Sequence, residues 1–265
     1  MILCRPLPCN RRAVTQAVAS SPPWDPTTPG TPNRWRSAED GKLWTNAGKT
    51  TAAGLGDAVY TVEALVGSDM VQSSATLRPY VATLGSRWAV RSDNVDDNTG
   101  NNDSVTAGAK TYGVIFEIFS APGASSAETI LRIGSSPNQI ILRHSGLSSS
   151  AAKGFHFGFD RSTTSQVCIQ DSAGPALLSN GVHTVVIRYD GVSATSASSY
   201  RCWLDGVEIT LTTGGNMAAS GFGRWLATSV PAEVCDCSIG EDVLYYSALA
   251  EADCIALSAY LEAMR

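Results

Sequence analysis

The segment from Gly181 to Leu211 constrains the fold more than any other part of the chain. Within it, two runs of strand type flank a loop rich in Ser and Ala. Apolar residues recur at every second position from Val185 to Tyr189, which is the period of a β-strand. The second run, Tyr200 to Leu204, ends at Asp205-Gly206, a pair typical of tight turns between antiparallel strands. The sequence therefore predicts an antiparallel β-hairpin at the centre of the fold.

The composition narrows the class of protein. The chain has 265 residues, 43% of them hydrophobic, which is enough for one large β domain or two small ones. Only 16% of the residues are charged, so Ser, Thr, Asn and Gly must supply much of the polar surface, as in β-rich extracellular or virion proteins. The net charge of −5, with Arg11-Arg12 as the only basic cluster, argues against nucleic-acid binding.

Neither a membrane span nor a secretory signal is expected. No apolar run reaches the length of a spanning helix, and Arg5 interrupts the apolar start after three residues. We therefore expect synthesis in a cytoplasm and no membrane insertion. An extracellular role would then require another route of release, such as assembly into a phage particle freed by lysis.

The seven cysteines do not form a metal or redox motif. No C-x-x-C pair occurs, and Cys235 and Cys237 share one strand face, which is a poor geometry for a mutual disulfide. We expect reduced, buried cysteines that act as small apolar residues, and leave a link between Cys4 and Cys9 open.

Residues 1–31 resemble an arm more than part of a core. A short helix is predicted from residue 11 to 20, followed by SPPWDPTTPGTP, which holds five of the twelve prolines and should be extended. Such an arm is suited to binding a neighbouring subunit, with Arg11, Arg12 and Trp24 as its assembly residues. The alternative is a tether that packs on its own domain.

An Asp- and Asn-rich loop provides the densest set of oxygen ligands. Its acidic members are Asp93, Asp96, Asp97 and Asp103. Calcium requires six to eight oxygens, but the spacing does not match an EF-hand loop. The loop is therefore either a calcium site or a solvated turn whose side chains bond their own backbone. No other cofactor is expected.

Further strands and one helix are predicted after this loop. The run from residue 111 to 121 is apolar on both faces and should be a central strand, and residues 128–146 should form a hairpin. In GFHFGFD, the three phenylalanines face one side and His156 the other. A C-terminal helix capped by Ser247 should present a short apolar stripe made of Ile255, Leu257 or Ala259, and Leu261.

Several motifs resemble known families. The string from His183 to Ile209, H-x-V-V-I-x-Y-D-G … W-L-D-G-V-E-I, resembles the central hairpin of concanavalin A-like (laminin-G-like) jelly-roll domains, and I-G-E-x-x-x-Y from Ile239 resembles their closing strand. LPCNRRAVTQAVASSPPWDP resembles the start of phage and prophage virion proteins from alphaproteobacteria. These resemblances imply an all-β, antiparallel jelly-roll β-sandwich over residues 32–265, with an N-terminal arm (1–31) and a short C-terminal helix.

Enzymes of this fold carry paired acids that the chain lacks. In glucanases, E-x-D-x-x-E aims two carboxylates at one sugar bond. Here Glu233 and Asp236 would face opposite sides of a strand, and the adjacent Glu241 and Asp242 would also diverge. The histidines lie on separate predicted strands, and no G-x-S-x-G elbow occurs. We therefore expect a protein without enzymatic activity.

Binding is the function that remains. Sugar sites on β-sandwiches combine an exposed aromatic ring with polar groups, and Trp225, Arg224 and Trp88 are the candidates. The alternative for each tryptophan is core packing, which we expect for Trp203, as for Tyr189 and Leu204. The first hypothesis is a non-enzymatic phage virion structural protein: a capsid decoration, head-fibre or tail-fibre subunit, homo-oligomeric and bound to other virion proteins. The alternative is a carbohydrate-binding module that recognises host surface glycan and so serves host attachment.

Overall fold

The structure, a computed structural model, describes most of the chain from Trp24 onward. The described residues are 24–39, 41–92, 99–100, 105–120, 127–135, 138–145, 154–159, 167–171, 178–216, 224–225 and 235–265. Within these ranges the chain forms β-strands, two short 3-10 turns, η1 (Ala75–Leu77) and η2 (Ala197–Ser199), and the α-helix α1 (Glu251–Glu262).

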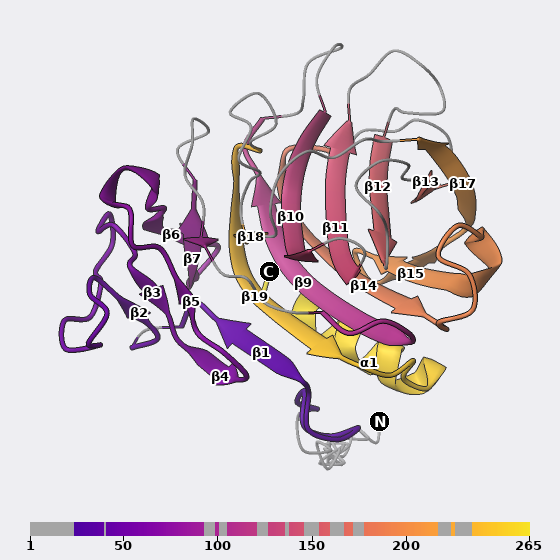
Figure 1. Ribbon diagram of the computed structural model, residues 1–265, viewed down its shortest axis with the longest axis horizontal. Helices are drawn as coiled ribbons and strands as arrows, with labels where there is room; N and C mark the ends of the chain where they lie inside the picture. Colours follow the sequence, from indigo (N-terminus) through magenta and orange to yellow (C-terminus); the bar gives the residue numbers. More distant parts are fainter. Residues whose placement is uncertain are drawn as a thin grey trace, which may run out of the picture.

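The strands form three sheets (Figure 1). The first sheet has the order β16 (Val207–Ile209), β15 (Tyr200–Leu204), β14 (Gly181–Tyr189), β9 (Lys110–Ile118), β19 (Cys237–Tyr245), β1 (Arg34–Ser37), β4 (Ala64–Val66). Two more strands belong to this sheet: β7 (Arg87–Arg91) pairs with β19, and β6 (Tyr80–Leu84) pairs with β7. The second sheet has the order β17 (Leu211–Asn216), β13 (Val167–Asp171), β12 (Gly154–Phe159), β11 (Asn138–Ser145), β10 (Ala127–Ser135), β18 (Arg224–Trp225), β8 (Thr99–Gly100). The small third sheet has the order β2 (Leu43–Trp44), β3 (Thr61–Val62), β5 (Met70–Val71).

The predicted hairpin lies where expected. Strands β14 and β15 pair antiparallel, with Val186 opposite Trp203, and β14 also pairs with β9 along its whole length. Strand β9 is central, as its apolar pattern predicts, because β19 pairs on its other side. The hairpin of β10 and β11 is confirmed as well.

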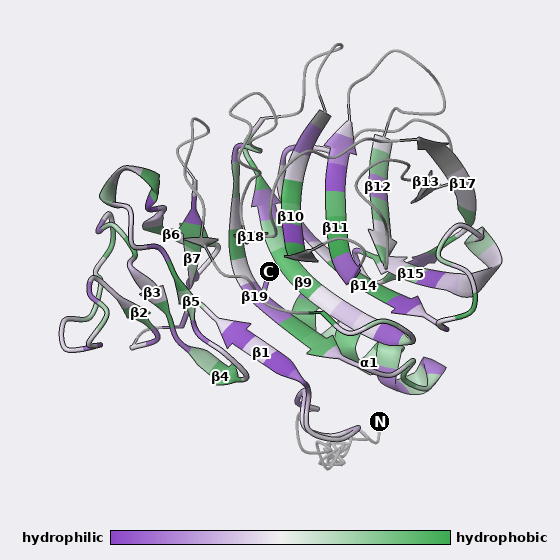
Figure 2. Ribbon diagram, viewed as in Figure 1, coloured by the Kyte–Doolittle hydropathy of each residue, from purple (hydrophilic) through white to green (hydrophobic). Residues whose placement is uncertain are grey.

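The first and second sheets pack face to face around one core. Phe155, Phe157 and Phe159 all point from β12 into this core, as their alternation predicts. Tyr189 of β14 stacks on Tyr200 of β15 with ring centroids 4.7 Å apart. Apolar residues line β9, β11 and β19 in Figure 2. The fold is therefore the predicted antiparallel jelly-roll β-sandwich.

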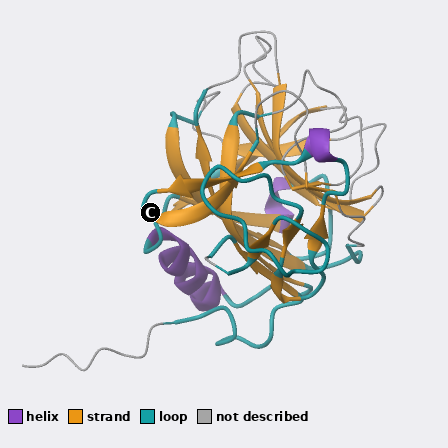
Figure 3. Cartoon of the chain, turned by 90° about the vertical axis from the view of Figure 1, so that its left-hand side faces the viewer, coloured by secondary structure: helices purple, strands orange, loops and turns teal. Residues whose placement is uncertain are grey.

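Helix α1 covers the outer face of the first sheet (Figures 1 and 3). Leu257 and Leu261 are fully buried there, against a layer that includes Ile115 and Trp203. Gly113 of β9 permits this close approach, since a Cβ at that position would lie 3.0 Å from Leu257 Cδ2. The core role expected of Trp203 is confirmed, in the layer under the helix.

Two details of the predicted helix are wrong. The helix begins at Glu251 with Ala250 as its N-cap, so Ser247 does not cap it. Instead, the Thr111 hydroxyl donates to the Ser247 carbonyl and accepts from the Leu249 amide, which holds the preceding residues extended. Leu257 and Leu261 of the predicted stripe are buried, but Ile255 is 50% exposed, because it does not face the sheet. The buried residues of the helix are Cys254, Leu257, Ser258 and Leu261.

The segment that starts at Trp24 lies against α1 and β19. The rings of Trp24 and Tyr260 are 5.7 Å apart, and the Tyr245 hydroxyl donates to the Pro26 carbonyl. Trp24, an expected assembly residue, thus contacts its own domain. Arg11 and Arg12 lie outside the described residues, and the division of the chain at residue 31 stays a prediction.

Candidate functional site

A surface depression of about 480 Å³ lies where β15, β16 and η2 meet the start of β17. This volume is in the range of ligand pockets in proteins. Its lining residues are Ala197, Ser198, Tyr200, Arg201, Glu208, Ile209, Thr210 and Leu211. We call it the Arg201 depression.

The local sequence explains why the depression forms. Asp205 and Gly206 both have positive φ, 49° and 78°, as a two-residue hairpin turn requires. Strand β16 then runs for only three residues before the chain enters β17 in the other sheet. The space beside Thr210, where the chain crosses between the sheets, is consequently left open.

Arg201 is the electrostatic centre of the depression. Its Nε donates to Glu208 at 2.7 Å and its Nη2 donates to Glu251 of α1 at 2.8 Å. These bonds, first that to Glu251 and then that to Glu208, raise the pKa of Arg201, and the bond from Arg201 lowers the pKa of Glu251. The guanidinium also lies over the Trp203 ring, 5.2 Å from its centroid. One cation between two carboxylates leaves a net negative charge at the rim.

The remaining lining groups are suited to a neutral polar ligand. Ser198 and Thr210 are exposed hydroxyls, and Ile209 and Leu211 add half-buried aliphatic surface. The Tyr200 hydroxyl is already engaged, since it donates to the Ala194 carbonyl. A pyranose has hydroxyl edges and apolar faces, so this mixture of donors, acceptors and aliphatic carbon fits a sugar.

A second, smaller recess lies beside Trp88 on the outer face of the first sheet. We call it the Trp88 pocket, and its empty volume, open solvent included, is about 240 Å³. It is lined by Ser37, Glu39, Leu84, Arg87, Trp88, Ile115, Gly240, Glu241 and Met264. The pairing of β19 with β9 shifts register between Ile239 and Glu241, which makes Gly240 the extra residue of a β-bulge at the pocket wall.

Glu241 lies at the floor of the Trp88 pocket and is only 2% exposed. Its Oε1 accepts from the Trp35 indole and from the Tyr260 hydroxyl, each at 2.7 Å. Burial raises the pKa of this carboxyl, and the donated hydrogen bonds offset the effect only in part.

Asp242, the next residue, faces the interior of the sandwich instead. Its Oδ2 accepts from Arg34 Nε at 3.0 Å and Nη2 at 2.5 Å, and from the Tyr112 hydroxyl at 3.2 Å. The expected divergence of Glu241 and Asp242 is confirmed. These two acids therefore cannot act on one glycosidic bond.

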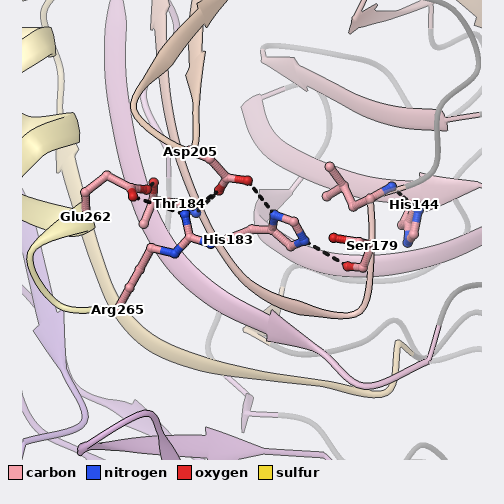
Figure 4. A network of polar contacts seen from close by, with 8 residues as sticks. His144, Ser179, His183, Thr184, Asp205, Glu262 and Arg265 are labelled. Carbon is pink, nitrogen blue, oxygen red and sulfur yellow. Dashed lines mark hydrogen bonds and ion pairs between the residues drawn. The ribbon is translucent and has the colours of Figure 1, made fainter.

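His183 participates in a network between the hairpin turn and the C-terminus (Figure 4). Its Nδ1 bonds Asp205 Oδ2 and its Nε2 bonds the Ser179 main-chain carbonyl, both at 2.8 Å. Burial alone would lower the pKa of His183, but the bonds to Asp205 and Ser179 raise it on balance. Ser179 contributes a carbonyl to this network and no hydroxyl. The His183–Asp205 pair therefore has a structural role. In a hydrolase triad the histidine would instead bond the hydroxyl of a nucleophile.

The tryptophans expected to bind sugar lie in different sheets. Trp88 is half-buried on β7 of the first sheet, whereas Arg224 and Trp225 form β18 of the second. There Trp225 is paired with Leu131, itself a core residue. The side chains of Arg224 and Trp225 are not among those that the structure describes, so a shared sugar site of these three residues stays a prediction. Sequence reasoning also missed Arg201 and Glu208, whose only signal was a pair of opposite charges on a hairpin.

The proposed calcium ligands Asp93, Asp96, Asp97 and Asp103 lie outside the described residues, so calcium stays a prediction. In the parts of the chain that the structure does describe, no group of three or more His, Cys, Asp or Glu residues is placed to hold a metal ion. Nor does any helix in those parts have the length and apolarity to cross a membrane.

Comparison with known proteins adds little. No family model and no curated protein matches the chain. A Trypanosoma rangeli sialidase in complex with the inhibitor DANA is 11% identical, with a TM-score of 0.45 over 85% of this chain and 32% of that one. A Ruminococcus gnavus IT-sialidase CBM40 bound to alpha2,3 sialyllactose is 14% identical, with a TM-score of 0.35 over 58% of this chain and 83% of that one. The chain spans about a third of the length of that T. rangeli sialidase. Likenesses this distant carry no argument about its ligand or activity.

Proposed function

We propose that this protein is a non-enzymatic, lectin-like module that binds glycan in the Arg201 depression. The observation that carries the proposal is the depression itself: about 480 Å³ of open space lined by hydroxyl, carboxylate, guanidinium and aliphatic groups. A site with this mixture recognises sugars by hydrogen bonds at their edges and apolar contact at their faces.

The absence of activity is part of the proposal. Among the described residues, the acids on β19 face opposite sides of the sheet, and the His183–Asp205 pair is bonded to a main-chain carbonyl. Neither arrangement supports the acid–base or nucleophilic chemistry of glycan cleavage.

A glycan array tests the binding proposal. Glu208→Gln and Thr210→Val remove a charge and a hydroxyl from exposed positions without disturbing the core. Since a hydrogen bond to a charged group contributes about 1.5–3 kcal/mol, Glu208→Gln should weaken binding roughly 10- to 100-fold. Trp225→Ala, the matched control outside the depression, should bind like the wild type. Absence of any signal for the wild type at high protein concentration would contradict the proposal.

We further propose that the module is a phage virion structural subunit, a capsid decoration, head-fibre or tail-fibre protein that also contacts copies of itself. This rests on the resemblance of residues 7–26 to the start of phage proteins and on the low content of charged residues. The contact between the rings of Trp24 and Tyr260 supports a design in which a deletion ends just before Trp24.

Deletion of residues 1–23 tests the virion role while sparing the Trp24 contact. The shortened protein should keep the melting temperature of the full chain, since the packing of Trp24 and Pro26 is retained. It should no longer join phage particles. Normal incorporation of the shortened protein would remove the anchoring role of the arm.

A further inference from the structure

We infer that the Trp88 pocket binds the acetamido group of an N-acetylated sugar. The inference deepens the proposed glycan binding by naming a ligand class, and it rests on that function. It concerns a separate recess, so the two sites can be tested one at a time.

The size of the closed end selects a very small group. The whole pocket offers about 10 Å³ to the centre of a water-sized sphere, which is room for one group of that size at its closed end. A hexose ring cannot enter such a space, but a methyl group can, with the flexible Met264 side chain adapting to it.

The chemistry of the closed end favours a methyl group over a water molecule. Leu84, Ile115 and Met264 form its apolar walls and are at most 4% exposed. The polar group at the floor, Glu241, is engaged by Trp35 and Tyr260. A buried water needs two to four polar partners, and this site presents few that are available.

The mouth of the pocket complements the amide of an acetamido group. Glu39 and Arg87 form an exposed ion pair at 3.4 Å there, with side chains 55% and 42% exposed. Exposed pairs of this kind contribute little stability, so a ligand can open them at small cost. The carboxylate accepts from the ligand N–H and the guanidinium donates to its C=O.

Gly240 keeps the pocket open. A Cβ at this position would lie 3.4 Å from Ile115 Cγ2 and 3.6 Å from Leu84 Cδ1, both at the pocket wall. These are ordinary contact distances, so alanine fits without strain. Gly240→Ala would therefore fill the recess with a methyl group of the protein and should leave the fold intact.

The test titrates the full chain with methyl N-acetyl-β-glucosaminide and with methyl β-glucoside, following tryptophan fluorescence. The wild type should bind the acetamido sugar at least 10-fold more tightly than the glucoside. Gly240→Ala should abolish this preference with an unchanged melting temperature. Arg87→Gln, an exposed substitution that spares the wall, should reduce it 3-fold or more.

Three results would overturn the inference. The two sugars could bind the wild type equally, Gly240→Ala could retain the preference, or N-acetyl-lysine could bind as well as the acetamido sugar. The last result would mean that the pocket selects the acetamido group without a sugar. Glu208→Gln separates the two sites: it should weaken binding at the Arg201 depression and leave the acetamido preference unchanged.

Discussion

Two consecutive acids on β19 lie in different layers of the molecule, and the layers differ in what they leave open. Asp242 lies between the two sheets, where Arg34 and Tyr112 donate hydrogen bonds to its carboxylate. Glu241 lies between the first sheet and α1, beside the Trp88 pocket. Two broad sheets bury each other's inner faces, whereas one helix covers only part of a sheet. The inner layer thus maintains the fold, and the outer layer and the sheet edge hold the recesses.

The largest expected effect comes from breaking the ion pair of the inner layer. Asp242→Asn leaves the Arg34 guanidinium buried without its counter-charge, which should lower the free energy of unfolding by about 3–5 kcal/mol. Urea denaturation measures the change. Arg87→Gln, which breaks the exposed pair with Glu39, should cost about 1 kcal/mol or less. Equal losses in the free energy of unfolding for the two variants would contradict the proposed difference between the inner and outer layers.

A smaller loss is expected when the helix-covered layer is opened. Leu257 is fully buried between α1 and β9, so Leu257→Ala should cost about 2–5 kcal/mol through lost packing and the cavity left behind. Ile255→Ala, two residues earlier on the exposed side, should change stability by about 0.5 kcal/mol at most. The same urea titration measures both changes in the free energy of unfolding. A large loss for Ile255→Ala would mean that the helix turns a different face toward the sheet.

The smallest effect concerns the charge of Glu241. Burial raises its pKa above the value of 4.5 that it has when unfolded. Its contribution to stability is therefore fully present below pH 4.5 and is lost as the pH rises through the folded pKa. Glu241→Gln removes this titration, so the wild type should lose stability relative to the variant as the pH rises from 4 to 7. Parallel pH profiles for the two proteins would show that Glu241 is solvated and not buried.

The strands were predictable because each carries its own pattern. The alternation from Val185 to Tyr189, the apolar run of β9 and the phenylalanines of β12 each identify a buried face within a few residues. The Asp205-Gly206 turn also predicts that β15 pairs with β16, which the structure shows. Local sequence was thus sufficient for the strands and the central hairpin, whereas the jelly-roll sandwich was implied by the family resemblance.

The candidate sites depend on contacts that local sequence does not contain. Arg201 meets Glu251 across fifty residues, and the strands that carry Trp88 and Trp225 belong to different sheets. The bulge at Gly240 shows only in the pairing register of β19. Which face of α1 is buried likewise depends on the position of Gly113, which lets Leu257 approach the sheet. Such features follow from packing between elements, so a pattern within one element cannot show them.

Mapping of backbone amide shifts by NMR, with a glycan that the wild-type protein binds on an array, tests the central claim most directly. The account predicts shifts at residues 197–201 and 208–211 around the Arg201 depression, and with N-acetylated sugars also at residues 84–88 and 239–241. Saturable shifts confined to other surfaces, with both recesses unperturbed, would contradict it.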